Sequence, residues 1–282
     1  MVGAENEFSD WIGKTQSVES DLSPWPARAA AAMLDAHELR IEPGAPLPPL
    51  WHWFYFLATA PQARLSVDGH PERGGFMPPI SLPRRMFAGA RVAFHRPLVL
   101  GRTAQRTDTI RNVELKEGRS GNLAFVKVSY AFHQDEELCI EEEQDIVYRE
   151  PGQPVPAPTV ATIEPEPRAW SRQVVPDARL LFRFSALTFN AHRIHYDRDY
   201  ANKEEGYPGL VVHGPLVAVL LADLVRRNEA RALQTFRFRG KAPLFDLAPL
   251  HLIGRPRSAE VELEALGPDG ATALTAAATL AE

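Results

Sequence analysis

The sequence is poor in cysteine and in positive charge, and it has no long apolar run. Cys139 is the only cysteine, which excludes an internal disulfide and a cysteine-based metal cluster. The 31 basic and 36 acidic residues give a net charge of -5, which provides no general attraction to nucleic acid or anionic membranes. No apolar run approaches the roughly eighteen residues that a membrane-spanning helix needs. The acidic, polar N-terminus is not typical of a secretory signal. We therefore expect a cytoplasmic protein without nucleic-acid or membrane partners.

Motifs that would indicate several common chemistries are also missing. There is no P-loop and no Gly-x-Gly-x-x-Gly pattern, so no glycine-rich loop is predicted to cradle phosphates. The absence of Gly-x-Ser-x-Gly disfavours a serine nucleophile. Cys139 lies in a strand-like run and is predicted to be an inert packing residue. We expect no resident cofactor.

A proline-rich segment divides the chain. With 282 residues, of which 45% are hydrophobic, the chain can form one large core or two smaller ones. Residues 151–168 are predicted to be an extended linker, because proline fixes φ and removes a backbone donor. The prolines are Pro151, Pro154, Pro156, Pro158, Pro165 and Pro167. The predicted parts are an N-terminal helical extension at residues 1–45, a first half at 46–150 and a second half at 169–282.

The first half is predicted to combine one buried helix with strands. Residues 47–60 are apolar almost all round, which favours a buried helix. A Gly/Pro-rich loop follows at residues 74–83. Residues 124–132 alternate between apolar and polar, as a strand with one buried face requires, and a hairpin turn is predicted at residues 118–121 before it.

The second half is predicted to repeat this order. Residues 178–184 are strand-like, and residues 213–228 form a helix with a broad apolar face, with a proline in its first turn. Four strands are expected after it, at residues 235–240, 250–254, 258–266 and 271–281. A faint sequence echo between residues 91–98 and 236–244 supports duplication. Each half is thus predicted to be an antiparallel sheet around a long buried helix, an α+β fold.

The densest group of polar functional residues lies at residues 184–197. Together with His213, the segment contributes His192 and His195 to a cluster of three of the nine histidines. Ordinary packing histidines remain one interpretation. A metal site on His192, His195 and Asp197 is another, but this spacing is not a recognised ligand pattern, and we predict no metal.

This segment resembles the signature of the MaoC-like hydratases. That signature runs Phe-x-x-Leu-[Ser/Thr]-Gly-Asp-x-Asn-Pro-[Ile/Leu]-His-x-Asp and is followed by Val-His-Gly at the start of a central helix. The matching residues are Phe184, Leu187, Thr188, Ile194, His195, Asp197, Val212, His213 and Gly214. Over residues 45–282 the chain also resembles the double-hot-dog branch, which includes the type-2 hydroxyacyl-thioester dehydratases and the mesaconyl-C4-CoA hydratases. The resemblance implies a double hot-dog fold and reversible addition of water to the α,β double bond of an enoyl-CoA.

Such a hydration requires a base, an acid and a donor for the thioester oxygen. His195 is expected to be the base, because histidine titrates near neutrality. The backbone N–H of Gly214, at the start of the helix, is expected to be the oxyanion donor. Asn190 replaces the aspartate of the signature and cannot supply a carboxylic proton, so we expect it to position water. The residues assigned supporting roles are His192, Asp197 and His213.

Basic residues are expected to hold the substrate. The candidates for coenzyme A are Arg84, Arg85, Arg237, Arg239 and Lys241. Arg193 replaces a proline of the signature and could pair with a second carboxylate. It suggests a small branched dicarboxylyl-CoA, such as mesaconyl-C4-CoA or itaconyl-CoA. One chain with two hot-dog folds already contains the pair that a site needs, so a homodimer is compatible but not required.

Three other functions stay open at this point. The first is dehydration of 3-hydroxyacyl thioesters of the fatty-acid type. The second is thioester hydrolysis by a hot-dog thioesterase, although that chemistry usually uses a carboxylate that faces the carbonyl. The third is acyl-CoA binding without catalysis, which the missing aspartate at Asn190 keeps open.

Overall fold

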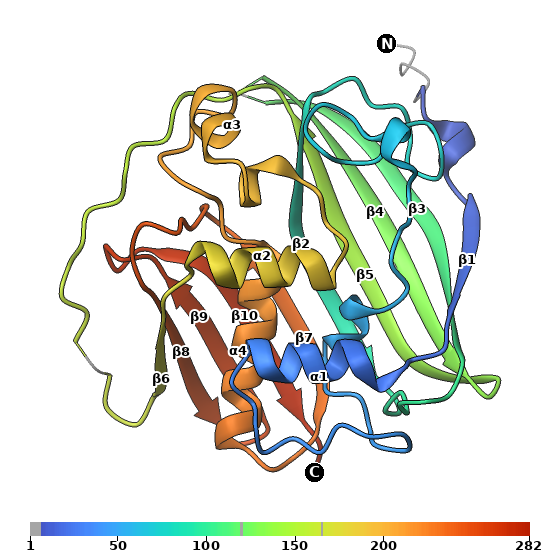
Figure 1. The fold of residues 1–282 in the computed structure, drawn as a ribbon, viewed down its shortest axis with the longest axis vertical. Helices are drawn as coiled ribbons and strands as arrows, with labels where there is room; N and C mark the ends of the chain where they lie inside the picture. The colour runs from blue at the N-terminus through green and yellow to red at the C-terminus, as the bar shows by residue number, and fades with distance from the viewer. Residues whose placement is uncertain (1–6, 119–120, 165) are drawn as a thin grey trace.

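The computed structural model describes residues 7–118, 121–164 and 166–282, and its main feature is one antiparallel sheet (Figure 1). The ten strands have the order β1-β3-β4-β5-β2-β7-β10-β9-β8-β6. The strands are β1 Thr15–Ser20, β2 Arg84–Phe94, β3 Ala104–Gly118, β4 Gly121–Gln134, β5 Glu137–Arg149, β6 Trp170–Val174, β7 Leu233–Gly240, β8 Leu250–Arg257, β9 Glu260–Leu266 and β10 Thr272–Leu280. The α-helices are α1 Pro24–Met33, α2 Ala178–Leu187, α3 Arg198–Lys203 and α4 Gly214–Asn228. The 3-10 helices are η1 Ser9–Trp11, η2 Trp51–Phe54, η3 Gln62–Arg64 and η4 Arg193–His195.

The two halves of the chain join edge to edge through β2 and β7, in the middle of the sheet. These strands pair antiparallel, with Arg91 opposite Arg237, and they include the first residues of the two segments of the sequence echo. A Cβ atom on Gly89 would lie 2.3 Å from the carbonyl oxygen of Phe238, so glycine is required for this close approach. The echo therefore marks equivalent strands that lie side by side.

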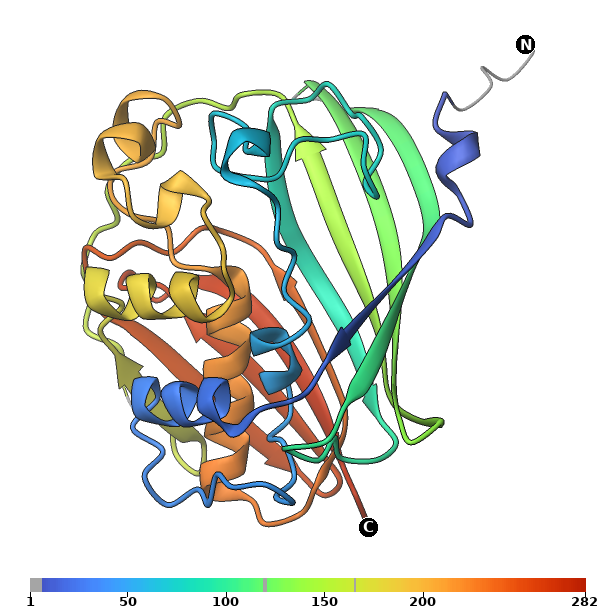
Figure 2. The ribbon, with the colours of Figure 1, turned by 45° about the vertical axis from the view of Figure 1, so that its right-hand side comes forward.

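Helix α4 forms the core of the second half, as its apolar periodicity predicts. Every residue from Leu216 to Val225 is buried, and strands β2 and β6 to β10 contact the helix. Figure 2 shows α4 along one face of the sheet, with α1 and α2 crossing over it. The strands predicted after this helix are confirmed as β7, β8, β9 and β10, with small shifts at their ends.

The buried helix predicted at residues 47–60 is wrong. Its apolar residues are buried, but they form only the short 3-10 helix η2. Leu50 and Phe56, on either side of it, have φ values of 67° and 54°, which an α-helix cannot accommodate. Pro48 and Pro49 restrict the chain before it. The first half therefore has no counterpart of α4 among its described residues.

The strand predicted at residues 178–184 is also wrong, because these residues form α2. Asp177 caps this helix, and its carboxylate accepts a hydrogen bond from the Leu180 N–H. Leu181, Phe184 and Ser185 are buried on one side of the helix, at helical spacing. The strand β4, in contrast, has the expected alternation of buried residues. The two central residues of the turn predicted before it lie outside the described residues.

The segments that flank the two halves differ in kind. The N-terminal extension contributes α1, as expected, but it also contributes β1, which pairs with β3 at the edge of the sheet. Residues 150–164 contain no helix or strand and run along one side of the molecule in Figure 1. This course is compatible with the extended linker that its prolines predict.

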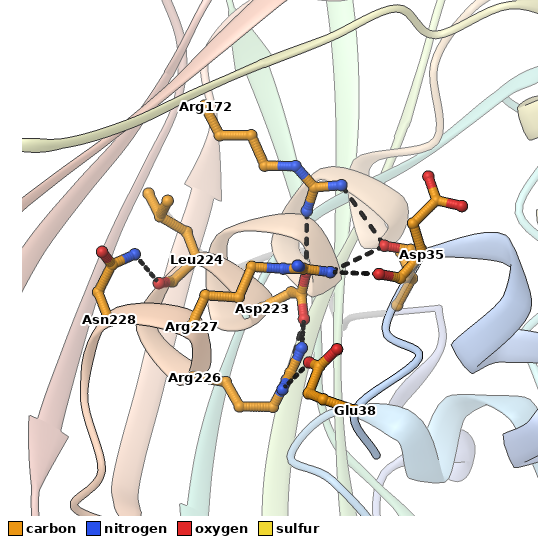
Figure 3. A network of polar contacts seen from close by, with 9 residues as sticks. Asp35, Glu38, Arg172, Asp223, Leu224, Arg226, Arg227 and Asn228 are labelled. Carbon is orange, nitrogen blue, oxygen red and sulfur yellow. Dashed lines mark hydrogen bonds and ion pairs between the residues drawn. The ribbon is translucent and has the colours of Figure 1, made fainter.

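A buried carboxylate fixes the C-terminal end of α4 to its surroundings (Figure 3). Asp223 is 3% exposed, and its oxygens accept hydrogen bonds from Arg172, Arg226 and Arg227 at 2.6 to 3.0 Å. Arg227 also donates to the carbonyl oxygen of Leu34, beyond the end of α1. Asp223 therefore ties the end of α4 to β6 through Arg172, and Arg227 ties it to the N-terminal extension.

Cys139 lies in β5 and is 3% exposed, which agrees with the predicted packing role. Burial raises the pKa of its thiol, so it is a poor nucleophile. Among the described residues, no helix is both long and apolar enough to span a membrane.

Candidate active site

A cavity of about 1200 Å³ lies between the two halves and is lined by residues of both. From the second half, His192, His195 and Gly214 reach it, and from the first half, Arg85 and His70 do so. A cavity of this size can hold an acyl group with part of its carrier. The segment with the signature thus lines this cavity.

The signature segment changes direction at the position where the MaoC-like pattern has glycine. Phe189 occupies this position with a φ of 49°, a conformation that glycine adopts most easily. The backbone N–H of Asn190 donates to the Ser185 carbonyl oxygen (2.8 Å). The side-chain oxygen of Asn190 accepts from the His192 N–H at 3.0 Å. Asn190 lines the cavity, but its side-chain oxygen stabilises the turn.

His195 is oriented as a base requires. Its Nδ1 lies 2.7 Å from the carbonyl oxygen of Val211, to which it donates. The neutral ring therefore keeps its lone pair on Nε2. Burial lowers the pKa of His195 to about 4, against the opposing effect of the hydrogen bond to Val211. The ring is thus uncharged at neutral pH and can accept a proton.

His213 supports the ring of His195. The two rings stack with their centroids 3.5 Å apart at an angle of 20°. The Nε2 of His213 lies 2.9 Å from the Ser185 hydroxyl oxygen. Its Nδ1 is buried without a hydrogen-bond partner in the described structure. Burial, together with the neighbouring imidazoles, holds the pKa of His213 well below its ordinary value.

His192 stands between His195 and two residues that sequence reasoning missed. The centroid of its ring lies 5.3 Å from that of His195 and 4.1 Å from that of His70. The Nδ1 of His70 lies 3.0 Å from a carboxylate oxygen of Asp68. Burial, with His70 and His195 adding to it, lowers the pKa of His192 to about 2. The short sequence Asp68-Gly69-His70 in a glycine-rich loop was the only available signal.

This group could also be considered for a metal. One atom each of Asp68, His70 and His192 lies within 4.8 Å of the others. A tetrahedral zinc site requires nitrogen and oxygen ligands roughly 3.4 Å apart, from bonds of about 2.1 Å. The alternative set considered from the sequence, His192, His195 and Asp197, is not assembled, because Asp197 bonds to Arg193 and to the Tyr200 N–H.

Gly214 is the first residue of α4 and lines the cavity. The N–H groups in the first turn of a helix lack helical acceptors and point out of the helix end. A Cβ atom here would approach only the carbonyl oxygen of Phe87, at 3.8 Å. The helix terminus is therefore open to the cavity.

Arg193 does not line the cavity. Its guanidinium donates to Asp197 at 2.8 and 3.1 Å and to the carbonyl oxygen of Val67 at 3.1 Å. It also lies over the ring of Tyr200, with 4.1 Å between the guanidinium carbon and the ring centroid. Asp197 in turn caps α3. Both residues stabilise the segment around His195 rather than facing the cavity.

The other predicted arginines fall into two groups. Arg84 and Arg85 line the cavity, whereas Arg237 and Arg239 are exposed on β7 and do not line it. Arg84 pairs with Glu205 at 2.8 Å. Arg85 has no hydrogen bond or ion pair from its side chain to any described residue, although it is only partly exposed. Arg149 also lines the cavity without such a partner, and of these two arginines Arg85 is the one that influences both His70 and His192.

Comparisons with known proteins show which proteins this chain is similar to. The profile of the family described as hydroxyacyl-thioester dehydratase type 2 matches residues 50–246. Over 274 residues, the chain is 63% identical to the mesaconyl-C(4)-CoA hydratase of Chloroflexus aurantiacus, covering 97% of this chain and 98% of that protein. The match to this relative covers nearly the whole chain and therefore both halves.

Solved structures support the fold. A MaoC-like dehydratase from Phytophthora capsici superposes with a TM-score of 0.69 at 14% identity, covering 98% of each chain. A Mycobacterium tuberculosis protein described as having a double hot-dog fold superposes with a TM-score of 0.58 at 12% identity, covering 95% of this chain and 96% of the other. The double hot-dog fold expected from the sequence is confirmed, although within residues 7–118, 121–164 and 166–282 the long helix occurs in the second half alone.

Proposed function

Because the chain belongs to the hydroxyacyl-thioester dehydratase type 2 family, we propose that it is a hydro-lyase that reversibly adds water to the α,β double bond of an enoyl-CoA. Its proposed substrate is a small branched dicarboxylyl-CoA such as mesaconyl-C4-CoA (3-methylfumaryl-CoA). The observation that carries the reaction class is the orientation of His195, whose Nδ1 is engaged by Val211 while the ring lines the cavity.

The reaction places new charge at two positions. As His195 accepts a proton from water through Nε2, the water oxygen bonds to the β carbon. The electron pair of the double bond then moves toward the α carbon and the thioester oxygen, where negative charge develops. The N–H of Gly214 is placed to stabilise this oxygen, since the positive end of the α4 dipole opens into the same cavity. Such a donor typically contributes about 3–4 kcal/mol.

The dicarboxylate assignment rests on Arg85. In 3-methylfumaryl-CoA the free carboxylate is attached to the β carbon, so its counter-charge must lie near the base. Arg85 lies close enough to His70 and His192 to lower the pKa of both, after the larger effect of burial. Its guanidinium has no partner among the described residues, so a substrate carboxylate can bind to it in a bidentate manner. This role replaces the one first predicted for Arg193.

Three other activities are less well supported. A dehydratase of long 3-hydroxyacyl thioesters would share His195 and Gly214, but it would have no use for the free charge of Arg85. A thioesterase or a binding protein would not need a base whose lone pair faces the cavity. We further propose a cytoplasmic enzyme without a resident cofactor. Both halves of its site come from one chain, so a homodimer is not required for activity.

The experiment compares mesaconyl-C4-CoA with crotonyl-CoA, which has no second carboxylate. Loss of the enoyl-thioester absorbance without release of free thiol supports hydration, whereas thiol release supports hydrolysis. We expect Arg85→Gln to reduce kcat/KM for mesaconyl-C4-CoA by roughly 10- to 100-fold, as loss of a charge-assisted bond implies, and to spare crotonyl-CoA. Arg237→Gln, on the outer face, is the matched control. An equal loss for both thioesters in Arg85→Gln would refute the substrate assignment.

A further inference from the structure

We propose that the loop of the first half at residues 66–70 supplies the proton-transfer group that the signature segment lacks at Asn190. In this proposal, which rests on the proposed hydratase function, His70 is a second catalytic residue and Asp68 is the positioning residue that orients it. The MaoC-like signature has an aspartate where this chain has Asn190, so the second group must come from elsewhere.

The loop is fixed directly to the signature segment. The backbone N–H of Arg193 donates to the carbonyl oxygen of Asp68 at 2.8 Å. Gly69 has a φ of 90°, and a Cβ atom there would lie 1.8 Å from the carbonyl oxygen of Ala191. The guanidinium of Arg193 holds the carbonyl oxygen of Val67 at 3.1 Å. The loop and the segment therefore form one rigid unit, although they come from different halves.

The departures from the signature explain this contact. A proline at position 193, as in the signature, would have no N–H to donate to Asp68. His192, which replaces an asparagine, places its ring 4.1 Å from the ring of His70, centroid to centroid. The chain thus differs from the signature at Asn190, His192 and Arg193. In the same region, the first half contributes a carboxylate and an imidazole to the cavity.

Asp68 orients His70 through two contacts. One carboxylate oxygen accepts the backbone N–H of His70 at 2.9 Å, and the other lies 3.0 Å from Nδ1. Nε2 of the ring is therefore left for other partners. Both side chains line the cavity, and they are only 15% and 19% exposed. A carboxylate held in this way beside an imidazole favours the protonated form of the ring.

The protonation of His70 depends on nearby charges, including that of Arg85, to which the substrate carboxylate is proposed to bind. Burial lowers the pKa of His70, Arg85 adds to this effect, and Asp68 opposes it. Burial disfavours the Asp68 carboxylate, but the hydrogen bonds and charge of His70 outweigh it and hold the pKa of Asp68 well below its usual range. A substrate carboxylate on Arg85 would offset the arginine charge and favour a protonated His70.

The proposed step transfers two protons. His195 takes one proton from water as the water oxygen bonds to the β carbon and the π bond breaks. The electron pair forms the bond between the α carbon and the proton that Nε2 of His70 gives up. One proton has then moved to His195 and one has left His70. The ring of His192, which contacts both rings, lies on the path by which the proton returns.

The test measures hydration of mesaconyl-C4-CoA by His70→Gln, Asp68→Asn and His95→Gln. We expect kcat of His70→Gln to fall about 100-fold or more, with KM little changed. His95 is the matched control, because it also contacts a carboxylate, that of Glu141, but lies outside the cavity. A His70→Gln variant that is folded by circular dichroism and has wild-type kcat would overturn the proposal.

Two further readouts separate a catalytic role from a structural one. Asp68→Asn should lower kcat roughly tenfold and shift the alkaline limb of its pH profile to lower pH, since the carboxylate no longer supports the protonated ring. Asn190→Asp should restore part of the lost rate in the His70→Gln background, because it returns the carboxyl group of the signature. An unshifted pH profile together with no rescue would contradict the proposal.

Three other outcomes would each contradict the proton-transfer role of His70. If activity follows bound zinc, is lost with a chelator and returns with added zinc, then Asp68, His70 and His192 form a metal site and the proton-transfer role is wrong. A wild-type protein that hydrates neither mesaconyl-C4-CoA nor crotonyl-CoA would remove the proposed function and this role together. Hydration by the wild type with an unaffected His70→Gln variant would remove this role alone.

Discussion

The two halves of the chain have the same sheet order but fill the concave side of the sheet differently. In the second half, strands of 5 to 9 residues surround α4. In the first half, β2 to β5 have 11 to 15 residues, and only the short η2 lies where the corresponding helix is expected. The cavity lies against the strands of the first half, with Phe87, Tyr130 and Phe132 in its wall. The absence of a long helix in one half thus makes room for a substrate.

This difference also divides the chemistry. The second half supplies imidazoles held by backbone groups and a helix terminus, namely His195 and Gly214. The first half supplies charged groups from a loop and a strand, namely Asp68 and Arg85. The second half therefore supplies the proposed base and oxyanion donor, and the first half supplies the groups proposed for substrate recognition and for the second proton transfer.

The largest expected effect is on kcat, and it comes from comparing substitutions of one buried histidine in each half. His195→Gln should reduce kcat by roughly 10³-fold, because it removes the base, and should change the free energy of unfolding by about 1 kcal/mol or less. His52 is 1% exposed, and its Nε2 lies 2.9 Å from the Glu142 carboxylate. His52 also lines the cavity, but no role in the reaction is assigned to it, so His52→Gln should instead cost about 2 kcal/mol of stability and reduce kcat far less than His195→Gln does.

Hydration kinetics and urea unfolding of the two variants provide the measurement. Similar losses of rate in both variants would mean that the effect of His195→Gln is not specific to the proposed base.

The next effect compares the buried carboxylates of the two halves. Removing Asp223 leaves three arginines without their shared partner, so Asp223→Ala should cost about 3–5 kcal/mol. Asp108, in β3, is 1% exposed and binds one arginine, Arg106, at 2.6 and 2.8 Å. Asp108→Ala should cost about 2 kcal/mol, since only one cation loses its partner.

Urea midpoints, with slopes compared to detect changes in the unfolded state, give both values. A larger cost for Asp108→Ala would mean that the long strands, and not α4, form the more cooperative part of the molecule.

The sequence predicted the second half better than the first, for a physical reason. Helix α4 and its strands have periodic apolar patterns that local reasoning can detect. Residues 47–60 are apolar all round, and this pattern does not distinguish a long helix from a short turn buried under a sheet. The left-handed conformations of Leu50 and Phe56, which end the turn, have no signal in the composition. Helix α2 was missed because its cap, Asp177, was not recognised.

The site residues that lie within the signature segment could be predicted from the sequence. Those that reach the cavity from distant segments could not. The signature located His195 and Gly214 in one cavity because neighbouring elements position them. Asp68 and His70 reach the same cavity through contacts between distant segments. Arg193 was assigned to the substrate from its place in the signature, but its pairing with Asp197 could be seen only in the folded chain.

The smallest expected effect tests whether the half with the helix loses stability by keeping its imidazoles uncharged. Burial lowers the pKa of His195 to about 4, whereas histidine in an unfolded chain titrates near about 6.5. Between these values the unfolded chain binds more protons than the folded one at this site, so the free energy of unfolding rises with pH. The stability is fully present above about pH 6.5 and is lost as the pH falls toward 4.

His195→Gln removes this dependence, so the wild type should lose up to about 1.4 kcal/mol more per pH unit than the variant. Urea midpoints at about pH 5, 6 and 7 give this difference, in which carboxylates common to both proteins cancel. Equal slopes would mean that His195 is as easily protonated in the folded protein as in the unfolded chain, and the neutral base inferred from its burial would be wrong.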